Sequence, residues 1–112
     1  MYIVFVTAFF AESENKPLAG MPRYIYKVSK YLIQRGHKVE IVAGAGFRKK
    51  WTYKGITVHN CETPQELEGN IFEISRKILY REIVFQKKLQ ELNKSEYIDI
   101  VQYAGWSGVG CL

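Results

Sequence analysis

Gly20 and Arg23 stand at the start of a predicted helix, and their types and spacing suit the binding of an anion. A glycine before a helix lets backbone N–H groups approach a ligand closely, and the positive end of the helix dipole favours negative charge. Arg23, in the first turn, adds a side chain that can make a charge-assisted hydrogen bond. The pair therefore predicts contact with a phosphate group. The competing interpretation is that Gly20 only forms a turn and that Arg23 is solvated.

The helix that positions this pair is predicted from its hydrophobic spacing. Apolar residues recur at intervals of about 3.6 residues and polar residues occupy the other side, as in a helix that packs on a sheet. Pro22 suits the first turn, because its missing N–H would have no partner there. Gly36 suits the end, because it adopts a left-handed conformation easily. The apolar stripe consists of Met21, Ile25, Val28 and Leu32, and the polar side of Arg23, Lys27, Lys30 and Gln34.

Four strands are predicted around this helix, at residues 2–8, 38–43, 56–59 and 97–103. The first is nearly continuously apolar, as in a parallel strand that is buried on both faces. Strands that alternate with helices predict an α/β domain of the Rossmann-like type, with a mostly parallel sheet and helices on both faces. Because such a sheet normally continues, we expect residues 1–112 to be an incomplete domain, truncated after the fourth strand.

The second helix has a predicted start at Thr63. A threonine cap, Pro64 in the first turn and Glu66 three residues after the cap match a capping box. Helical spacing then continues to about residue 93, as one helix or as two joined near Gly69 and Asn70. The apolar positions of this segment are Ile71, Ile74, Ile78, Phe85, Leu89 and Leu92.

No cofactor or metal is expected. The dinucleotide fingerprint Gly-x-Gly-x-x-Gly directly follows a first strand, whereas Gly44 and Gly46 follow the second predicted strand and indicate a turn. His37 and His59 are isolated in the sequence, and no carboxylates lie at ligand spacing, so a metal site is not predicted. We interpret His37 as a structural residue between helix and strand.

Composition favours a single folded domain in the cytoplasm. Hydrophobic residues make up 47% of the chain, no apolar run approaches the ~20 residues of a membrane span, and no secretory signal is present. Cys61 and Cys111 lack metal-site spacing and are predicted to be free thiols, with a disulfide as the alternative. The net charge of +5 permits an anionic partner, but without a dense basic stripe or motif, nucleic acid is not expected.

Two basic segments suggest an anionic surface as a partner. Residues 47–51, predicted as a loop before a turn at residues 53–55, contain three consecutive basic residues and Trp51. Residues 76–88 combine basic and apolar side chains at helical spacing. Together they predict a basic amphipathic surface for peripheral attachment to an anionic membrane. The alternative is a solvated basic face.

Three motifs resemble the N-terminal domain of glycosyltransferase family 4, enzymes of the GT-B fold. Members have a loop ending in Gly-Gly-x-x-Arg, and here Ala19 and Gly20 occupy the glycine pair before Arg23. The family continues with Arg-Gly-His-x-Val and a strand, as in residues 35–42. Residues 98–102, Ile-Asp-Ile-Val-Gln, are similar to the family's Asp-Val-Val-His strand, with glutamine in place of histidine.

The resemblance implies a hexosyltransferase-type enzyme with its active site in a cleft between two domains. The C-terminal domain would hold most nucleotide-sugar contacts, and this N-terminal part would shape the acceptor site. We therefore expect the 112-residue chain alone to be inactive and the second domain to be absent from it. The catalytic residues are not assigned by these motifs.

Further candidate substrate-binding residues lie at the predicted carboxyl ends of the strands, where open α/β sheets collect ligands. Lys16 in the first loop is placed to touch an acceptor, although polar loops are usually solvated. Tyr103, Trp106 and Ser107 follow the fourth predicted strand, and an aromatic ring there would stack on a sugar or pack in the core.

A second function class remains open. A sheet that ends after four strands would leave apolar faces uncovered, and such faces favour association. The alternative to the enzyme is therefore a small non-catalytic α/β interaction module that forms homo-oligomers through its open sheet.

Overall fold

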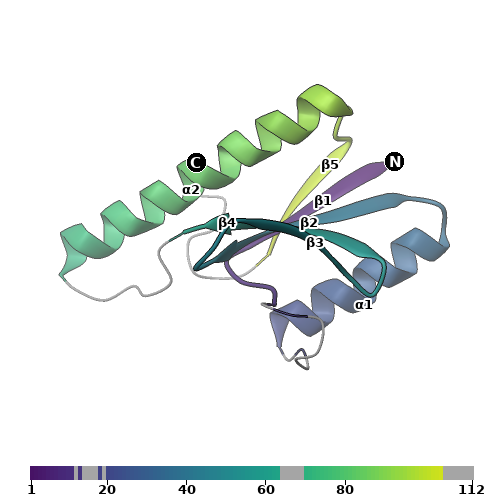
Figure 1. Ribbon diagram of the computed structural model, residues 1–112, viewed down its shortest axis with the longest axis horizontal. Coiled ribbons are helices and arrows are strands. Elements are labelled where there is room, and N and C mark those ends of the chain that lie inside the picture. The colour runs from purple at the N-terminus through teal and green to yellow at the C-terminus, as the bar shows by residue number, and fades with distance from the viewer. Residues whose placement is uncertain (12, 14–17, 19, 64–69, 105–112) are drawn as a thin grey trace.

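The computed structural model describes residues 1–11, 13, 18, 20–63 and 70–104. These residues form five strands and two helices (Figure 1). The predicted α/β class is confirmed. In chain order the elements are β1 (Tyr2–Thr7), α1 (Met21–Gln34), β2 (Lys38–Ala45), β3 (Lys49–Tyr53), β4 (Ile56–Glu62), α2 (Ile71–Ser95) and β5 (Ile100–Ala104).

The strands form one mixed sheet in the order β3-β4-β2-β1-β5. β1 pairs in parallel with β2 on one side and with β5 on the other, and β2 pairs in parallel with β4. β3 is antiparallel to β4. The mostly parallel sheet that the sequence predicts is therefore present.

Alternate residues of β1 contribute to two separate apolar clusters, because successive side chains of a strand point to opposite faces. Ile3 and Phe5 belong to the cluster that contains Ile25 of α1. Val4 and Val6 belong to the cluster that contains Phe85 of α2. We call these two sides of the sheet the α1 face and the α2 face. Figure 1 shows the two helices on either side of the strands.

α1 packs as its sequence spacing predicts. Ile25 is fully buried, and Val28 and Leu32 pack against the same cluster, whereas Met21 at the first position is exposed. The end of the helix also matches the prediction, since Gly36 has a φ of 90°. The N–H groups of Gly36 and His37 donate to the carbonyl groups of Ile33 and Leu32, at 3.0 and 3.1 Å. These are the two hydrogen bonds of a Schellman motif.

The prediction of a loop at residues 47–51 was wrong, because Lys49–Tyr53 forms strand β3. Trp51 packs against the α1-face cluster, which includes Tyr53, and the strand lies at the edge of the sheet, where lysines reach solvent. Its presence makes the predicted fourth strand the fifth. The predicted turn is confirmed: Lys54 and Gly55 have φ values of 45° and 88°, as a two-residue hairpin turn requires.

Three predicted boundaries also differ from the structure. Gly44 lies inside β2, which extends to Ala45, so the predicted turn at Gly44 was wrong. β4 likewise extends past its predicted end at residue 59, to Glu62. β5 begins at Ile100, three residues after the predicted start. β2 and β4 thus continue side by side past the predicted ends, with Gly44 paired to Cys61.

α2 begins at Ile71, directly after the junction near Gly69 and Asn70 that the two-helix interpretation predicted. The side chain of Asn70 caps it by accepting a hydrogen bond from the N–H of Glu73 at 3.0 Å. Thr63 is buried before this start, and residues 64–69 lie outside the described residues. Ile71, one of the apolar positions at helical spacing, is 74% exposed. The buried stripe of α2 lies further along the helix, where Phe85 and Leu89 pack on the sheet.

Candidate functional site

Gly20 and Arg23 lie where α1 begins, at the edge of the sheet where the parallel strands end. Gly20 has φ 64° and ψ −136°, a combination that other residues rarely adopt, and it makes no side-chain cap. A Cβ atom placed on Gly20 would meet no atom of the described residues within 4 Å. The first turn contains no acidic residue. Both Gly20 and Arg23 are exposed. Within the part of the chain that the structure describes, this geometry leaves the start of α1 accessible to an anion.

Tyr103 occupies a different place from this pair. It lies on β5, packs against the α2-face cluster, and accepts a hydrogen bond from Nε2 of Gln86 at 3.1 Å. Tyr103 and Gly20 therefore belong to opposite faces of the sheet. The other predicted site residues, Lys16, Trp106 and Ser107, lie outside the described residues.

A polar network lies within the α2 face. Oε1 of Glu40 accepts a hydrogen bond from the hydroxyl of Tyr2 at 2.9 Å and lies 2.7 Å from Nε2 of His59. Lys38 Nζ lies 3.7 Å from the other carboxylate oxygen of Glu40. His59, isolated in the sequence, is thus joined to a carboxylate by the pairing of β2 with β4. The signal in the sequence was a glutamate within the apolar run of β2.

The network keeps Glu40 ionised at neutral pH. The hydrogen bond to His59 lowers the pKa of Glu40 most, and the bond to Tyr2 and the charge of Lys38 act in the same direction, against burial. Burial, and then the bond to Glu40, raise the pKa of Tyr2 far above its usual value. The carboxylate therefore accepts from both neighbours and fixes the orientation of the His59 ring.

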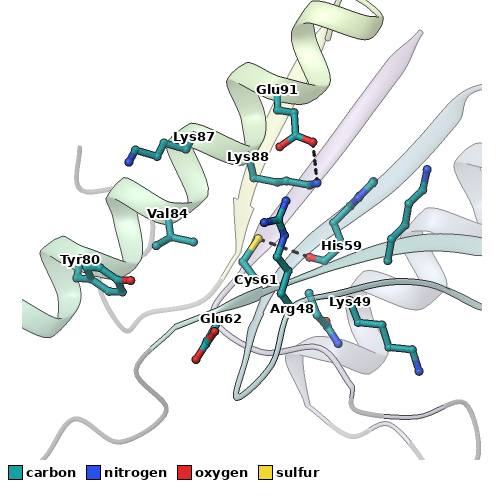
Figure 2. A pocket seen from close by; sticks show the side chains of 12 residues that line it. Arg48, Lys49, His59, Cys61, Glu62, Tyr80, Val84, Lys87, Lys88 and Glu91 are labelled. Atoms are coloured by element: carbon teal, nitrogen blue, oxygen red, sulfur yellow. Dashed lines mark hydrogen bonds and ion pairs between the residues drawn. The ribbon is translucent and has the colours of Figure 1, made fainter.

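A groove lies next to this network, between α2 and the β3–β4 hairpin (Figure 2). Its volume is about 470 Å³, and His59 and Cys61 belong to its wall. Burial raises the pKa of the Cys61 thiol, so the thiol is protonated at neutral pH. The two basic segments noted in the sequence meet at this groove. The sequence indicated each segment separately, but only the fold brings them together.

His37 lies in the turn between α1 and β2. Nδ1 of His37 lies 3.2 Å from the amino group of Met1, so this ring holds the chain terminus against the end of α1. Among the described residues, no group of three or more histidine, cysteine, aspartate or glutamate side chains is arranged to hold a metal ion. Cys61 is a buried free thiol, and Cys111 lies outside the described part of the chain.

No protein-family model, curated protein or solved structure gives a significant match to this chain. Neither α1 nor α2, the helices found in the described residues, is long and apolar enough to cross a membrane.

Proposed function

We propose that this chain is the acceptor-side part of a GT-B glycosyltransferase. In this proposal its sheet is the Rossmann-like, doubly wound sheet of the N-terminal domain, with one helix on each face. A second domain would supply the nucleotide sugar, and the acceptor would bind at the carboxyl edge of the strands. The observation that carries the proposal is the open, glycine-specific backbone of Gly20 at the start of α1, followed by the exposed Arg23.

The chemistry of this helix start supports a role in binding a phosphorylated acceptor or the donor diphosphate. The first turn presents backbone N–H groups without a side-chain cap, and the helix dipole favours negative charge there. Arg23 adds a cation with a planar set of donors that matches a phosphate group. The Schellman end at Gly36 supports the resemblance in the residues that follow, since it places them in the predicted turn and strand.

The test is an assay of sugar transfer and donor hydrolysis by the protein expressed from its complete reading frame. A panel of nucleoside diphosphate sugars serves as donors. We expect consumption of at least one donor, and a loss of about tenfold in kcat/KM for Arg23→Ala, because one charge-assisted hydrogen bond to a phosphate is removed.

Lys27→Ala is the matched control, since Lys27 is exposed on the same helix one turn further from the proposed site. It should leave kcat/KM within about twofold of the unmodified protein, as expected for a surface substitution. If no donor in the panel is consumed, the proposal of a glycosyltransferase is wrong. If both substitutions reduce turnover equally, Arg23 has no specific role.

An interaction module remains the second candidate, and the edge of the sheet favours it. Among the strands of the described residues, β5 ends the order on one side, and Ile100 on that strand is 40% exposed. Two copies that pair through β5 would satisfy the open backbone groups of the edge. Sedimentation velocity between about 5 and 200 μM should then show a dimer that Ile100→Lys dissociates. A monomer at every concentration would contradict this candidate.

A further inference from the structure

The groove between α2 and the β3–β4 hairpin carries an excess of positive charge. We propose that it binds the phosphate group of a small phosphorylated molecule. Its volume of about 470 Å³ lies within the range of small-molecule sites. Five basic side chains and two carboxylates line it, namely Arg48, Lys49, Lys50, Lys87 and Lys88 with Glu62 and Glu91.

Arg48 and Lys88 form the centre of this site. Figure 2 shows their charged ends converging from the hairpin and from α2, above Cys61. The charges of both also act on the Cys61 thiol, where they oppose the effect of burial on its pKa. Among the described residues Arg48 has no ion-pair partner, and Lys88 has only a 3.4 Å contact with Glu91. A phosphate between the two cations replaces their repulsion with charge-assisted hydrogen bonds.

His59 supplies a further polar contact on the wall of the groove. It is only 3% exposed, and its Nδ1 atom has no hydrogen-bond partner. Because Nε2 is held by the Glu40 carboxylate, the neutral ring carries its proton there and leaves Nδ1 as an acceptor. A hydroxyl group or a protonated phosphate oxygen of the ligand can donate to this atom after a small shift of the groove wall, since the atom itself is buried.

The remaining wall suits the organic part of a phosphate ester. Tyr80 and Val84 lie along α2 at the groove, and Tyr80 is 56% exposed. An exposed aromatic ring beside a phosphate site can stack on a sugar or a base. Lys49 does not join the centre, because it points away from α2 in Figure 2 and its Nζ lies 6.0 Å from the centroid of the Trp51 ring.

The concave arrangement favours a small molecule over a membrane surface or a nucleic-acid strand. Arg48 and Lys88 converge on one point in a groove, whereas a bilayer meets cations that are spread over a flat or convex face. A nucleic-acid strand needs cations that follow its backbone over several nucleotides. The site is also separate from the start of α1, so it does not depend on sugar transfer.

The experiment is a titration of the ¹⁵N-labelled protein with inorganic phosphate and with adenosine 5′-monophosphate, followed by NMR and calorimetry. Amide shifts should centre on residues 48–50, 59–62 and 80–91, with the nucleotide binding more tightly than phosphate alone. The double substitution Arg48→Gln and Lys88→Gln should weaken binding at least tenfold. The matched control, Lys27→Gln and Lys30→Gln, removes the same charge from exposed positions on α1 and should change affinity less than twofold.

Two single substitutions at exposed positions test the site even if the double variant fails to fold. Tyr80→Ala should weaken binding of the nucleotide about fivefold and leave phosphate binding unchanged, because only the organic part contacts the ring. Glu91→Gln should strengthen binding of both ligands two- to fivefold, because it removes a carboxylate beside Lys88.

Three results would overturn the proposal. Equal weakening by the groove and control double variants would show a response to net charge alone. Shifts centred on Gly20 and Arg23 would place the ligand at α1 instead. Binding of an RNA dodecamer or of vesicles containing phosphatidylserine, without binding of either phosphate ligand, would assign the cations to a macromolecular surface. Arg23→Ala should leave groove binding unchanged, which separates this proposal from the proposed transferase activity.

Discussion

The two faces of the sheet differ in what they bury. On the α1 face, Tyr53 makes edge-to-face ring contacts with Phe10, Tyr26 and Trp51, at centroid distances of 5.4, 5.5 and 6.1 Å. On the α2 face, β2 and β4 hold a partly buried carboxylate and a buried imidazole, Glu40 and His59. One face is a closed apolar core, while the other combines an apolar cluster with a polar network and an open groove.

The α1 face therefore contributes mainly to stability, and the α2 face is the one suited to bind a ligand. Aromatic and aliphatic side chains on the α1 face pack around a buried centre that includes Ile25 and Tyr53, which suits a structural core. The α2 face keeps polar atoms next to a groove, where they are available to a ligand. Substitutions on the α1 face should therefore reduce stability most, and those on the α2 face should show smaller, pH-dependent effects.

The largest expected effect tests the closed core directly. Ile25→Ala on α1 should lower the free energy of unfolding by about 3–5 kcal/mol, because a fully buried side chain is removed from a site with little room to relax. Leu89→Ala on α2 removes a similar side chain that is 7% exposed, and should cost about 2–3 kcal/mol. Urea denaturation measures both. Equal losses would show that the two faces are equally closed.

Gly44→Ala should have the next largest effect. A Cβ atom at this position would lie 2.5 Å from the backbone oxygen of Ala8 and from Oγ1 of Thr63. Because a backbone atom cannot move aside easily, we expect a loss of about 2–3 kcal/mol in thermal or urea unfolding. Gly46→Ala is the control, since a Cβ there meets no atom within 4 Å. A harmless Gly44→Ala would mean that the chain after β1 does not cross β2 this closely.

Glu40→Gln should have the smallest effect of the three, about 1–2 kcal/mol at pH 7. The amide oxygen can still accept one hydrogen bond, but the charge that holds both Tyr2 and His59 is lost. Thr57→Ala, at the position that pairs with Glu40 in the sheet, is a control for disturbance of the strands. Urea denaturation at several pH values measures the loss.

The difference in stability between the unmodified protein and Glu40→Gln should depend on pH, in a direction set by the pKa of Glu40. The pKa of Glu40 is lower in the folded protein than its usual value of 4.5, so ionisation of Glu40 stabilises the fold above that value. This stabilisation is lost as the pH falls through the lowered folded pKa. The difference in stability between the unmodified protein and Glu40→Gln should therefore shrink at acidic pH. A difference that stays constant between pH 7 and pH 3 would contradict an ionised Glu40 in the network.

Local signals predicted α1 well, because they are contained within the helix itself. The spacing of Ile25, Val28 and Leu32 indicates the buried side, and Gly36 indicates the end. β3 was missed for a physical reason: at a sheet edge, two exposed lysines can begin a strand that ends at the buried Tyr53, so the sequence shows a basic segment instead of an apolar strand.

Signals that depend on distant partners were weaker. Asn70 caps α2, whereas the sequence indicated it only as part of a junction between two helices, and Pro64 and Glu66 of the predicted capping box lie outside the described residues. The pairing of Glu40 with His59 depends on the register of β2 with β4, which cannot be read from either strand alone. The groove likewise requires Arg48 and Lys88 to meet across two elements.

The position of β1 in the sheet also has a consequence for synthesis of the chain. Its partner β2 and the β3–β4 hairpin follow within the first 62 residues, so four of the five described strands can pair before α2 and β5 are made. The other edge of β1 pairs with β5, and the N–H of Tyr2 donates to Asp99, 97 residues away. While the ribosome completes α2, the apolar outer edge of β1 remains exposed, and it is there that a nascent chain would need protection from other strands.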